Sequence, residues 1–398
     1  MLDGFDVSIY LFVLVPALIE LLRLEGFEPS PANIAVYGGY FFTVFMVGWA
    51  CSMLWGWLAD RIGRVKVMCL TILVYSVCTA LCGLATSLLA FGIFRFLSGF
   101  GVGGEWAAGT PLLQESVPEK MRAKFAAWLH TAIPVGMLLA ALVSLMLPVI
   151  GWRGMFLIGA LPALLTIYLR LRIPESEAWR RARSERTRVR DLFLRRNARN
   201  TWSAALMMSC IILGLWSSTF WVPTLVTTKL IEIGRPLAEA QRLASVSGIL
   251  ASIGTLIACL AMPYLASMIG SRRMTAAIFF VGAFLSNLVA YLVLAHWISD
   301  VYLFLWAIPV LGFFTNGVFA LYTMWLPEMF PTSQRAFGSG FAFSFGRLLG
   351  AVGPAMIGMI VASTASYPIA ITIVSAIYLI GLPFIALAPE TANRPLPT

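Results

Sequence analysis

Long apolar segments recur along this chain of 398 residues and dominate what it can fold into. Hydrophobic residues make up 60% of the sequence and charged residues 12%, whereas soluble domains are about half apolar and about one-quarter charged. A helix needs about 20 mainly apolar residues to cross the hydrocarbon core of a bilayer. Twelve segments reach or approach that length, at 3–22, 34–59, 66–87, 88–115, 121–148, 152–171, 201–223, 243–267, 274–296, 301–325, 335–362 and 366–388. The sequence therefore predicts an all-α integral membrane protein with twelve transmembrane helices.

The first of these segments is shorter than the others and carries two acidic residues at its start. Asp3 and Asp6 precede a mainly apolar run, Ile9–Leu22, of only 14 residues. Such a run is too short to span a bilayer alone. Either this helix lies unusually in the membrane, or the chain lacks its first part. We favour an N-terminal truncation of the helix, which would put both carboxylates near the middle of the membrane.

Positive charge gathers on one side of the predicted membrane. If the loop 61–66 is placed inside, 21 of the 28 Lys and Arg residues lie on the inner side, five lie on the outer side, and Arg95 and Arg347 fall within helices. This asymmetry follows the positive-inside rule and puts both termini in the cytoplasm. The Arg-rich stretch 180–199 is then a solvated linker near anionic headgroups, so the net charge of +10 does not indicate a nucleic-acid partner.

An internal repeat divides the chain into two similar parts. Three motifs recur, pairing Glu115–Ala123 with Glu328–Ala336, Gly63–Lys66 with Gly270–Arg273, and Pro174–Ser176 with Pro389–Thr391. The repeat predicts two pseudo-symmetric six-helix bundles at 1–172 and 201–398, joined by a basic cytoplasmic linker at 173–200. Both bundles have an even number of spans and therefore run in the same direction. Transporters built from such repeats bind solute between the halves, near the bilayer midplane.

The loop Gly56–Lys66 has the sequence G-W-L-A-D-R-I-G-R-V-K. It closely resembles the signature G-x-x-x-D-R-x-G-R-R/K of the major facilitator superfamily, except that Val65 occupies a usually basic position. The resemblance implies that this loop helps to latch the cytoplasmic side shut; the alternative is a plain topology signal. The implied gate residues are Asp60, Arg61, Arg64, Glu115, Arg122, Glu328 and Arg335.

Further stretches resemble the sialate:proton and monocarboxylate:proton symporters of this superfamily. They are Leu2–Asp6, Gly103–Trp106, Gly151–Arg153, Ile173–Trp179 and Pro327–Thr332. Sugar porters and aromatic-acid symporters share some of them. The resemblance implies a secondary active transporter that takes up a small organic anion with protons by alternating access, with monocarboxylates such as lactate or pyruvate favoured. A proton-coupled or facilitative sugar transporter and a drug or metabolite exporter are the alternatives.

Charged residues inside membrane segments face a cavity or a partner, because lipid exposure is costly. In the related symporters an aspartate of the first helix meets an arginine of the fourth, and Asp6 and Arg95 match these positions. The resemblance implies that Asp6 carries the proton and that Arg95 tunes it. Asp3 lies three residues earlier, on the same helix face, and is a second proton-coupling candidate. The alternative is a fixed buried ion pair.

Arg347 is our main candidate for holding a carboxylate substrate. It lies between Gly346 and Gly350 in the eleventh segment, where small neighbours leave room for a ligand. A guanidinium binds a carboxylate in a planar, two-pronged geometry; the alternative is a bond to a backbone carbonyl. The further candidates for substrate contact, each with helix packing as its alternative, are His130, Asn316, Tyr322, Trp216 and Glu105.

No phosphate-binding loop, zinc-protease motif or hydrolase nucleophile elbow occurs in the sequence, so we expect neither an enzyme nor a cofactor or metal. The expected partners are a small organic anion, protons and the lipid bilayer. We expect a monomeric, multi-pass protein of the cytoplasmic (inner) membrane.

Overall fold

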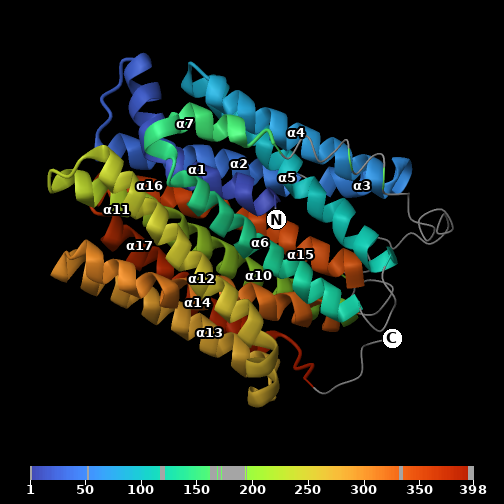
Figure 1. Cartoon of the computed structure of the whole chain (residues 1–398). Coiled ribbons are helices and arrows are strands. Elements are labelled where there is room, and N and C mark those ends of the chain that lie inside the picture. The colour runs from blue at the N-terminus through green and yellow to red at the C-terminus, as the bar shows by residue number, and fades with distance from the viewer. Residues whose placement is uncertain are drawn as a thin grey trace.

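The computed structural model describes residues 2–51, 53–116, 122–161, 168, 172, 193, 195–330 and 335–392. Every regular element in these ranges is a helix, and most helices run side by side along one long axis (Figure 1). Ten are long and apolar enough to cross a membrane, and two shorter apolar helices, Thr131–Ser144 and Leu147–Ile158, complete the set. The prediction of twelve membrane helices is confirmed.

The first half of the protein begins inside the bundle. Its helices are α1 (Leu2–Leu24), α2 (Pro31–Cys51), α3 (Met53–Ile62), α4 (Arg64–Leu84), α5 (Leu88–Ser116), α6 (Arg122–Ser144) and α7 (Leu147–Ile158). The Tyr10 hydroxyl donates to the Gly38 carbonyl (3.1 Å), which pairs the first part of α1 with the middle of α2. The N-terminal end of α1 therefore lies at mid-height of the bundle (Figure 1). The position of Asp3 and Asp6 near the middle of the membrane stays a prediction.

The second half repeats this architecture with more interruptions. Its elements are α10 (Arg195–Ser218), the short 3₁₀ helix η3 (Thr219–Trp221), α11 (Val222–Glu232), α12 (Leu237–Ile269), α13 (Arg272–Asn287), the π-helix η4 (Leu288–Ile298), α14 (Val301–Glu328), α15 (Arg335–Gly350), α16 (Val352–Thr364), α17 (Tyr367–Ser375) and α18 (Ile377–Leu387). Most of the predicted linker 173–200 lies outside the described residues. The division into 1–172, 173–200 and 201–398 therefore stays a prediction.

Two glycine turns, at Gly63 and Gly270, mark one end of the bundle, which we call the linker end; we call the opposite end the far end. Gly63 joins α3 to α4 with a φ of 116°, and Gly270 ends α12 with a φ of 70°. Both values lie in the region that glycine adopts without a Cβ penalty. These are the repeat-related positions in the sequence, so the same turn chemistry recurs in both halves.

The two halves touch closely toward the far end. There α2 packs on α16, and α6 packs on α12. The Ser144 hydroxyl donates to the Ser245 hydroxyl across the α6–α12 contact (2.7 Å). A Cβ added to Gly39 of α2 would lie only 2.5 Å from the Pro354 carbonyl oxygen of α16. Small residues thus let the helices approach at backbone distance, as in many membrane helix pairs.

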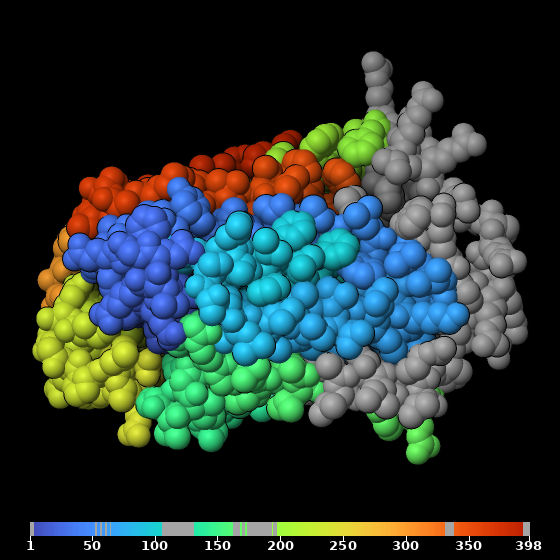
Figure 2. Space-filling view, turned by 90° about the horizontal axis from the view of Figure 1, so that it is seen from above, coloured from blue at the N-terminus to red at the C-terminus, as the bar shows by residue number. Residues whose placement is uncertain are grey.

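The outer surface is apolar where lipid would lie. On α4, which lies on the face shown in Figure 2, Leu70, Leu73 and Val77 are exposed. Arg95, in contrast, has no exposed surface at all. The charge predicted to avoid lipid is therefore enclosed by protein, as its desolvation cost requires.

The close contact at Gly39 predicts how the far end can be forced open. Gly39→Leu overpacks the α2–α16 contact, which costs about 1–3 kcal/mol and favours separation of the halves. In a variant whose native cysteines are replaced by serine, we expect Ser245→Cys, which is fully buried, to react with a maleimide about tenfold faster when Gly39→Leu is added. Gly340→Leu is the matched control, because nothing lies within 4 Å of its added Cβ. Equal reaction rates in the two backgrounds would contradict this assignment.

Candidate functional site

Asp6 lies in a fully buried polar site between α1, α4 and α5. The Ser98 hydroxyl of α5 donates to Asp6 Oδ2 (3.1 Å), and Ser98 Oγ is 2.8 Å from the Thr79 hydroxyl of α4. A Cβ added to Gly159 would lie 3.4 Å from Asp6 Oδ1, so the end of α7 closes the site. The carboxyl group thus accepts a hydrogen bond from Ser98, which is itself bonded to Thr79, in a buried site where a proton can be bound out of contact with lipid.

Arg95 lies one helical turn before Ser98 on α5 and is held between two rings. Its guanidinium carbon is 4.3 Å from the ring centroids of both Tyr10 and Phe45. Among the described residues, none accepts a hydrogen bond from its three guanidinium nitrogens. Cation–π contacts with desolvated rings contribute about 2 kcal/mol each, but a buried cation without acceptors remains costly. Asp6 and Arg95 therefore occupy neighbouring parts of one buried region without sharing a hydrogen bond.

A row of aromatic rings on α2 connects this buried region to the second half of the protein. Phe42, Phe45 and Trp49 lie on one face of α2. The centroid of the Phe42 ring lies 4.2 Å from that of Phe220 and 4.9 Å from that of Trp216, and both of these residues belong to the second half. Phe42 and Phe45 were not among the residues predicted from the sequence, although a spacing of three and then four residues is the signal of one helix face.

Arg347 of α15 lies at the other end of the row. Its guanidinium carbon is 4.7 Å from the centroid of Trp49, which belongs to the opposite half, and 5.6 Å from that of Phe343. Arg347 is half-buried. The Phe45 and Trp49 rings are in edge contact, with centroids 5.8 Å apart, so rings of α2 connect the surroundings of the two membrane arginines. The structure places Arg347 at the junction of the halves.

The other substrate candidates are distributed more widely. Trp216 is half-buried against α2, whereas Asn316 is buried and donates to the Thr315 hydroxyl (3.3 Å). Tyr322 is fully buried inside the second half, with its hydroxyl 3.4 Å from the Met207 sulfur. Glu105 is half-buried on α5. Their roles in substrate contact stay predictions, and the side chains of Asp3 and His130 lie outside the described residues.

At the linker end, Glu328 forms a charged cluster within the second half. Its carboxylate accepts hydrogen bonds from Arg272 Nε (3.2 Å) and Nη2 (3.1 Å) and from the Thr391 hydroxyl (2.6 Å). Such a two-pronged contact is among the stronger polar interactions in proteins. The remaining predicted gate residues, whose side chains lie outside the described part of the chain, are Asp60, Arg61, Arg64, Glu115, Arg122 and Arg335, so the gate stays a prediction.

Glu390 is the second acidic member of this cluster and was not among our predicted residues. It accepts hydrogen bonds from the Ser271 hydroxyl (2.5 Å) and from the backbone N–H groups of Arg272, Arg273 and Ala392. Burial by itself raises the pKa of Glu390, but these hydrogen bonds outweigh it and lower the pKa from 4.5 to about 2. The carboxylate therefore binds the first turn of α13, where a helix N-terminus favours negative charge.

The repeat could have located Arg272 and Glu390, because the motifs that contain them are repeated in the first half. Counting from the paired glycines, Gly63 and Gly270, Arg272 corresponds to Val65. Val65 is buried and apolar. The first half therefore lacks a basic residue at the position where the second half binds Glu328.

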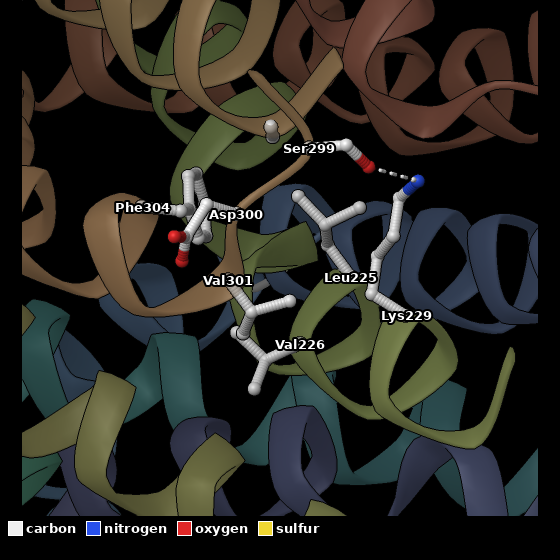
Figure 3. Close-up of a pocket in the computed structure, with 8 residues that line it drawn as sticks. Leu225, Val226, Lys229, Ser299, Asp300, Val301 and Phe304 are labelled. Atoms are coloured by element: carbon white, nitrogen blue, oxygen red, sulfur yellow. Dashed lines mark hydrogen bonds between the residues drawn. The ribbon is translucent and has the colours of Figure 1, made fainter. Parts of the chain in front are cut away.

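A separate pocket in the second half contains none of the predicted residues. It lies at the far end between α11, η4 and α14, and its lining includes Leu225, Lys229, Asp300 and Phe304 (Figure 3). Lys229 Nζ is 3.5 Å from the Ser299 hydroxyl.

Among the described residues, no three His, Cys, Asp or Glu side chains lie together as a metal site.

Comparison with known proteins agrees with this architecture. A family model described as Major Facilitator Superfamily matches residues 1–295. A Haemophilus influenzae protein, provisionally described as a metabolite transport protein, is 31% identical over 414 residues and covers 99% of this chain and 95% of its own. The sialic acid transporter NanX of Escherichia coli is 27% identical over 358 residues, covering 89% and 83% of the two chains. The partially occluded, inward-open xylose transporter XylE of Escherichia coli has a TM-score of 0.72 at 17% identity, covering 99% of this chain and 96% of that chain.

The lowered pKa of Glu390 predicts a pH-dependent contribution to stability. The carboxylate stabilises the fold fully above its unfolded pKa of 4.5, and this stabilisation is lost as the pH falls toward the folded value of about 2. We expect Glu390→Gln to lower the Tm by about 1–2 °C at pH 7, because screening keeps a partly exposed contact below about 1 kcal/mol. The difference from the unsubstituted protein should shrink below pH 4.5. Glu239→Gln, which removes an exposed carboxylate at the far end, is the control. A difference that stays constant down to pH 3 would contradict this account.

Proposed function

Since the chain belongs to the Major Facilitator Superfamily and is a membrane transporter, we propose that it takes up a small organic anion together with protons. A monocarboxylate such as lactate or pyruvate is the proposed substrate. The sialic acid transporter NanX of Escherichia coli, a relative over most of the chain, supports an acid, because sialic acid carries a carboxyl group. The xylose transporter likeness, at 17% identity, concerns the fold alone.

The position of Arg347 is the single observation that supports an anionic substrate best. Its guanidinium is half-buried, and it lies against Trp49 of the opposite half. A carboxylate bound there would make charge-assisted hydrogen bonds with the guanidinium, which are strong in a low-dielectric site. A neutral sugar carries no negative charge, so an anion would bind this site more strongly than a sugar would.

Asp6 is the proposed proton carrier. It is fully buried, and it lies beside the Arg95 region without a hydrogen bond from that arginine. A carboxyl group in such a place changes its proton affinity strongly when a nearby cation approaches or withdraws. Movement of α1 relative to α5 during the transport cycle would therefore bind and release a proton.

The proposed mechanism is alternating access between the two halves. The far-end contacts at Gly39 and Ser144 would close one entrance while the linker end opens. We propose that both termini and the linker end face the cytoplasm, on the basis of the positive-inside distribution. Uptake across the inner membrane by a monomer follows as part of this proposal.

Replacement of Arg347 tests the anion site. We expect Arg347→Ala to reduce lactate uptake into proteoliposomes about tenfold to a hundredfold, because a charge-assisted hydrogen bond contributes about 1.5–3 kcal/mol. Arg242→Ala, which removes an exposed arginine from α12, is the control and should transport normally. Sugar uptake that persists in Arg347→Ala, with no uptake of any acid by the unsubstituted protein, would end the anion proposal.

Replacement of Asp6 tests proton coupling. Asp6→Asn cannot ionise, so an imposed pH gradient should no longer accumulate lactate, whereas exchange of labelled for unlabelled lactate should continue. Glu20→Gln is the control, since it removes a carboxylate from the same helix, where Glu20 pairs with Arg153 at the far end (2.8 Å). Gradient-driven accumulation in Asp6→Asn vesicles would assign the proton to another residue.

A further inference from the structure

The guanidinium of Arg95 is enclosed by aromatic rings instead of by hydrogen-bond acceptors. Its central carbon lies 4.3 Å from the ring centroid of Tyr10 on α1 and 4.3 Å from that of Phe45 on α2. The side chain has no exposed surface, and within the described part of the chain no group accepts a hydrogen bond from its nitrogens. A ring face attracts a guanidinium most strongly where water is excluded. The rings of Tyr10 and Phe45, which we call the Arg95 cage, therefore hold the cation in this place.

Tyr10 is fixed by contacts from both halves of the protein. Its hydroxyl donates to the Gly38 carbonyl of α2 (3.1 Å), and its ring lies nearly parallel to that of Phe42, with centroids 6.2 Å apart. On another side, the centroid of Phe220 lies 6.0 Å from that of Tyr10. Phe220 belongs to η3 in the second half. A displacement of η3 against α1 would therefore disturb the Arg95 cage.

Asp6 lies close enough to the Arg95 cage to be an alternative partner for the arginine. The Ser98 hydroxyl donates to Asp6 Oδ2 (3.1 Å), and Ser98 follows Arg95 by three residues on α5, a spacing that makes side chains neighbours on a helix. The Cys82 thiol of α4 lies within electrostatic range of both Asp6 and Arg95. A change in the side-chain torsions of Arg95 can thus exchange contact with the rings for contact with the carboxylate.

We propose that Tyr10 and Phe45 are positioning residues for proton coupling, which hold Arg95 away from Asp6 in this conformation so that Asp6 can keep its proton. The inference rests on the proposed role of Asp6 as proton carrier, and it adds the device that decides when the proton is released. When the halves move and the cage is disturbed, Arg95 turns to Asp6. A cation at close range favours the ionised carboxylate, so the proton leaves to the side of the membrane that is then open.

The other titratable groups that face Asp6 cannot replace the arginine in this role. On α4 they are the thiols of Cys78 and Cys82, which carry no positive charge in either protonation state. The end of α7 presents Gly159, which has no side chain. Among the described residues, Asp6 and Arg95 are the only fully buried side chains with a formal charge. The position of Arg95 therefore decides the electrostatic surroundings of the carboxyl group.

Infrared titration of the purified protein in lipid vesicles tests the proposal, because a protonated carboxyl group has a C=O stretch that the ionised form lacks. Asp6→Asn identifies the Asp6 band by its loss. We expect Phe45→Leu to lower the pH midpoint of this band by about one pH unit, a tenfold change in proton concentration, since a released Arg95 stabilises the carboxylate. Phe41→Leu is the matched control and should keep the midpoint, because Phe41 is a buried ring of the same helix that packs edge-on against Phe91.

Tyr10 provides a second pair of variants. Tyr10→Leu removes the other ring of the Arg95 cage and should lower the midpoint as Phe45→Leu does. Tyr10→Phe keeps the ring and loses only the hydroxyl, so its midpoint should match that of the unsubstituted protein. This pair serves as the test if Phe45→Leu does not yield folded protein.

The outcomes separate the cage from the proposed proton carrier. A midpoint that is unchanged or raised in both Phe45→Leu and Tyr10→Leu would overturn the cage and leave Asp6 as the carrier. An equal fall in Phe41→Leu would also overturn the cage, because the effect would then follow from the loss of any buried ring. If the unsubstituted protein has no titrating band that Asp6→Asn removes, both the cage and the proposed role of Asp6 are wrong.

Discussion

The burial of two arginines within an apolar bundle is the constraint on which the centre of this protein depends. Arg95 has no surface exposed, and Arg347 is half-buried at the junction of the halves. Neither cation is tolerated against hydrocarbon without compensation. The rings of Phe45 and Trp49 on α2 provide part of that compensation to both. Helix α2 is therefore the element that carries the aromatic link between the proposed proton site and the proposed substrate site.

The same helix carries the contact that brings the halves together. Gly39 lies on the part of α2 that meets α16 at backbone distance, and Trp49 lies further along, toward the linker end. Gly39 allows close helix packing at the far end because it lacks a side chain. The second position presents a large ring to Arg347. A change in the tilt of α2 would consequently alter both the far-end contact and the surroundings of the arginine.

The two halves are alike in topology but differ in their charges at the linker end. The second half fixes Glu328 with Arg272 and fixes Glu390 on the first turn of α13. In the first half, the position that corresponds to Arg272 is the buried Val65. The repeat therefore kept acidic residues at the positions of Glu328 and Glu390, namely Glu115 and Glu175, but not the arginine that binds Glu328 in the second half.

The sequence by itself determined the twelve spans and the two halves, because apolar length and repeat spacing are local properties of the chain. It also marked Arg95 and Arg347, since a charge inside an apolar run is visible without coordinates. Only the tertiary structure decided that Trp49 lies against Arg347 and that Ser98 rather than Arg95 bonds Asp6. Such contacts join helices far apart in the sequence, and they depend on helix rotation and tilt, which helix periodicity alone does not specify.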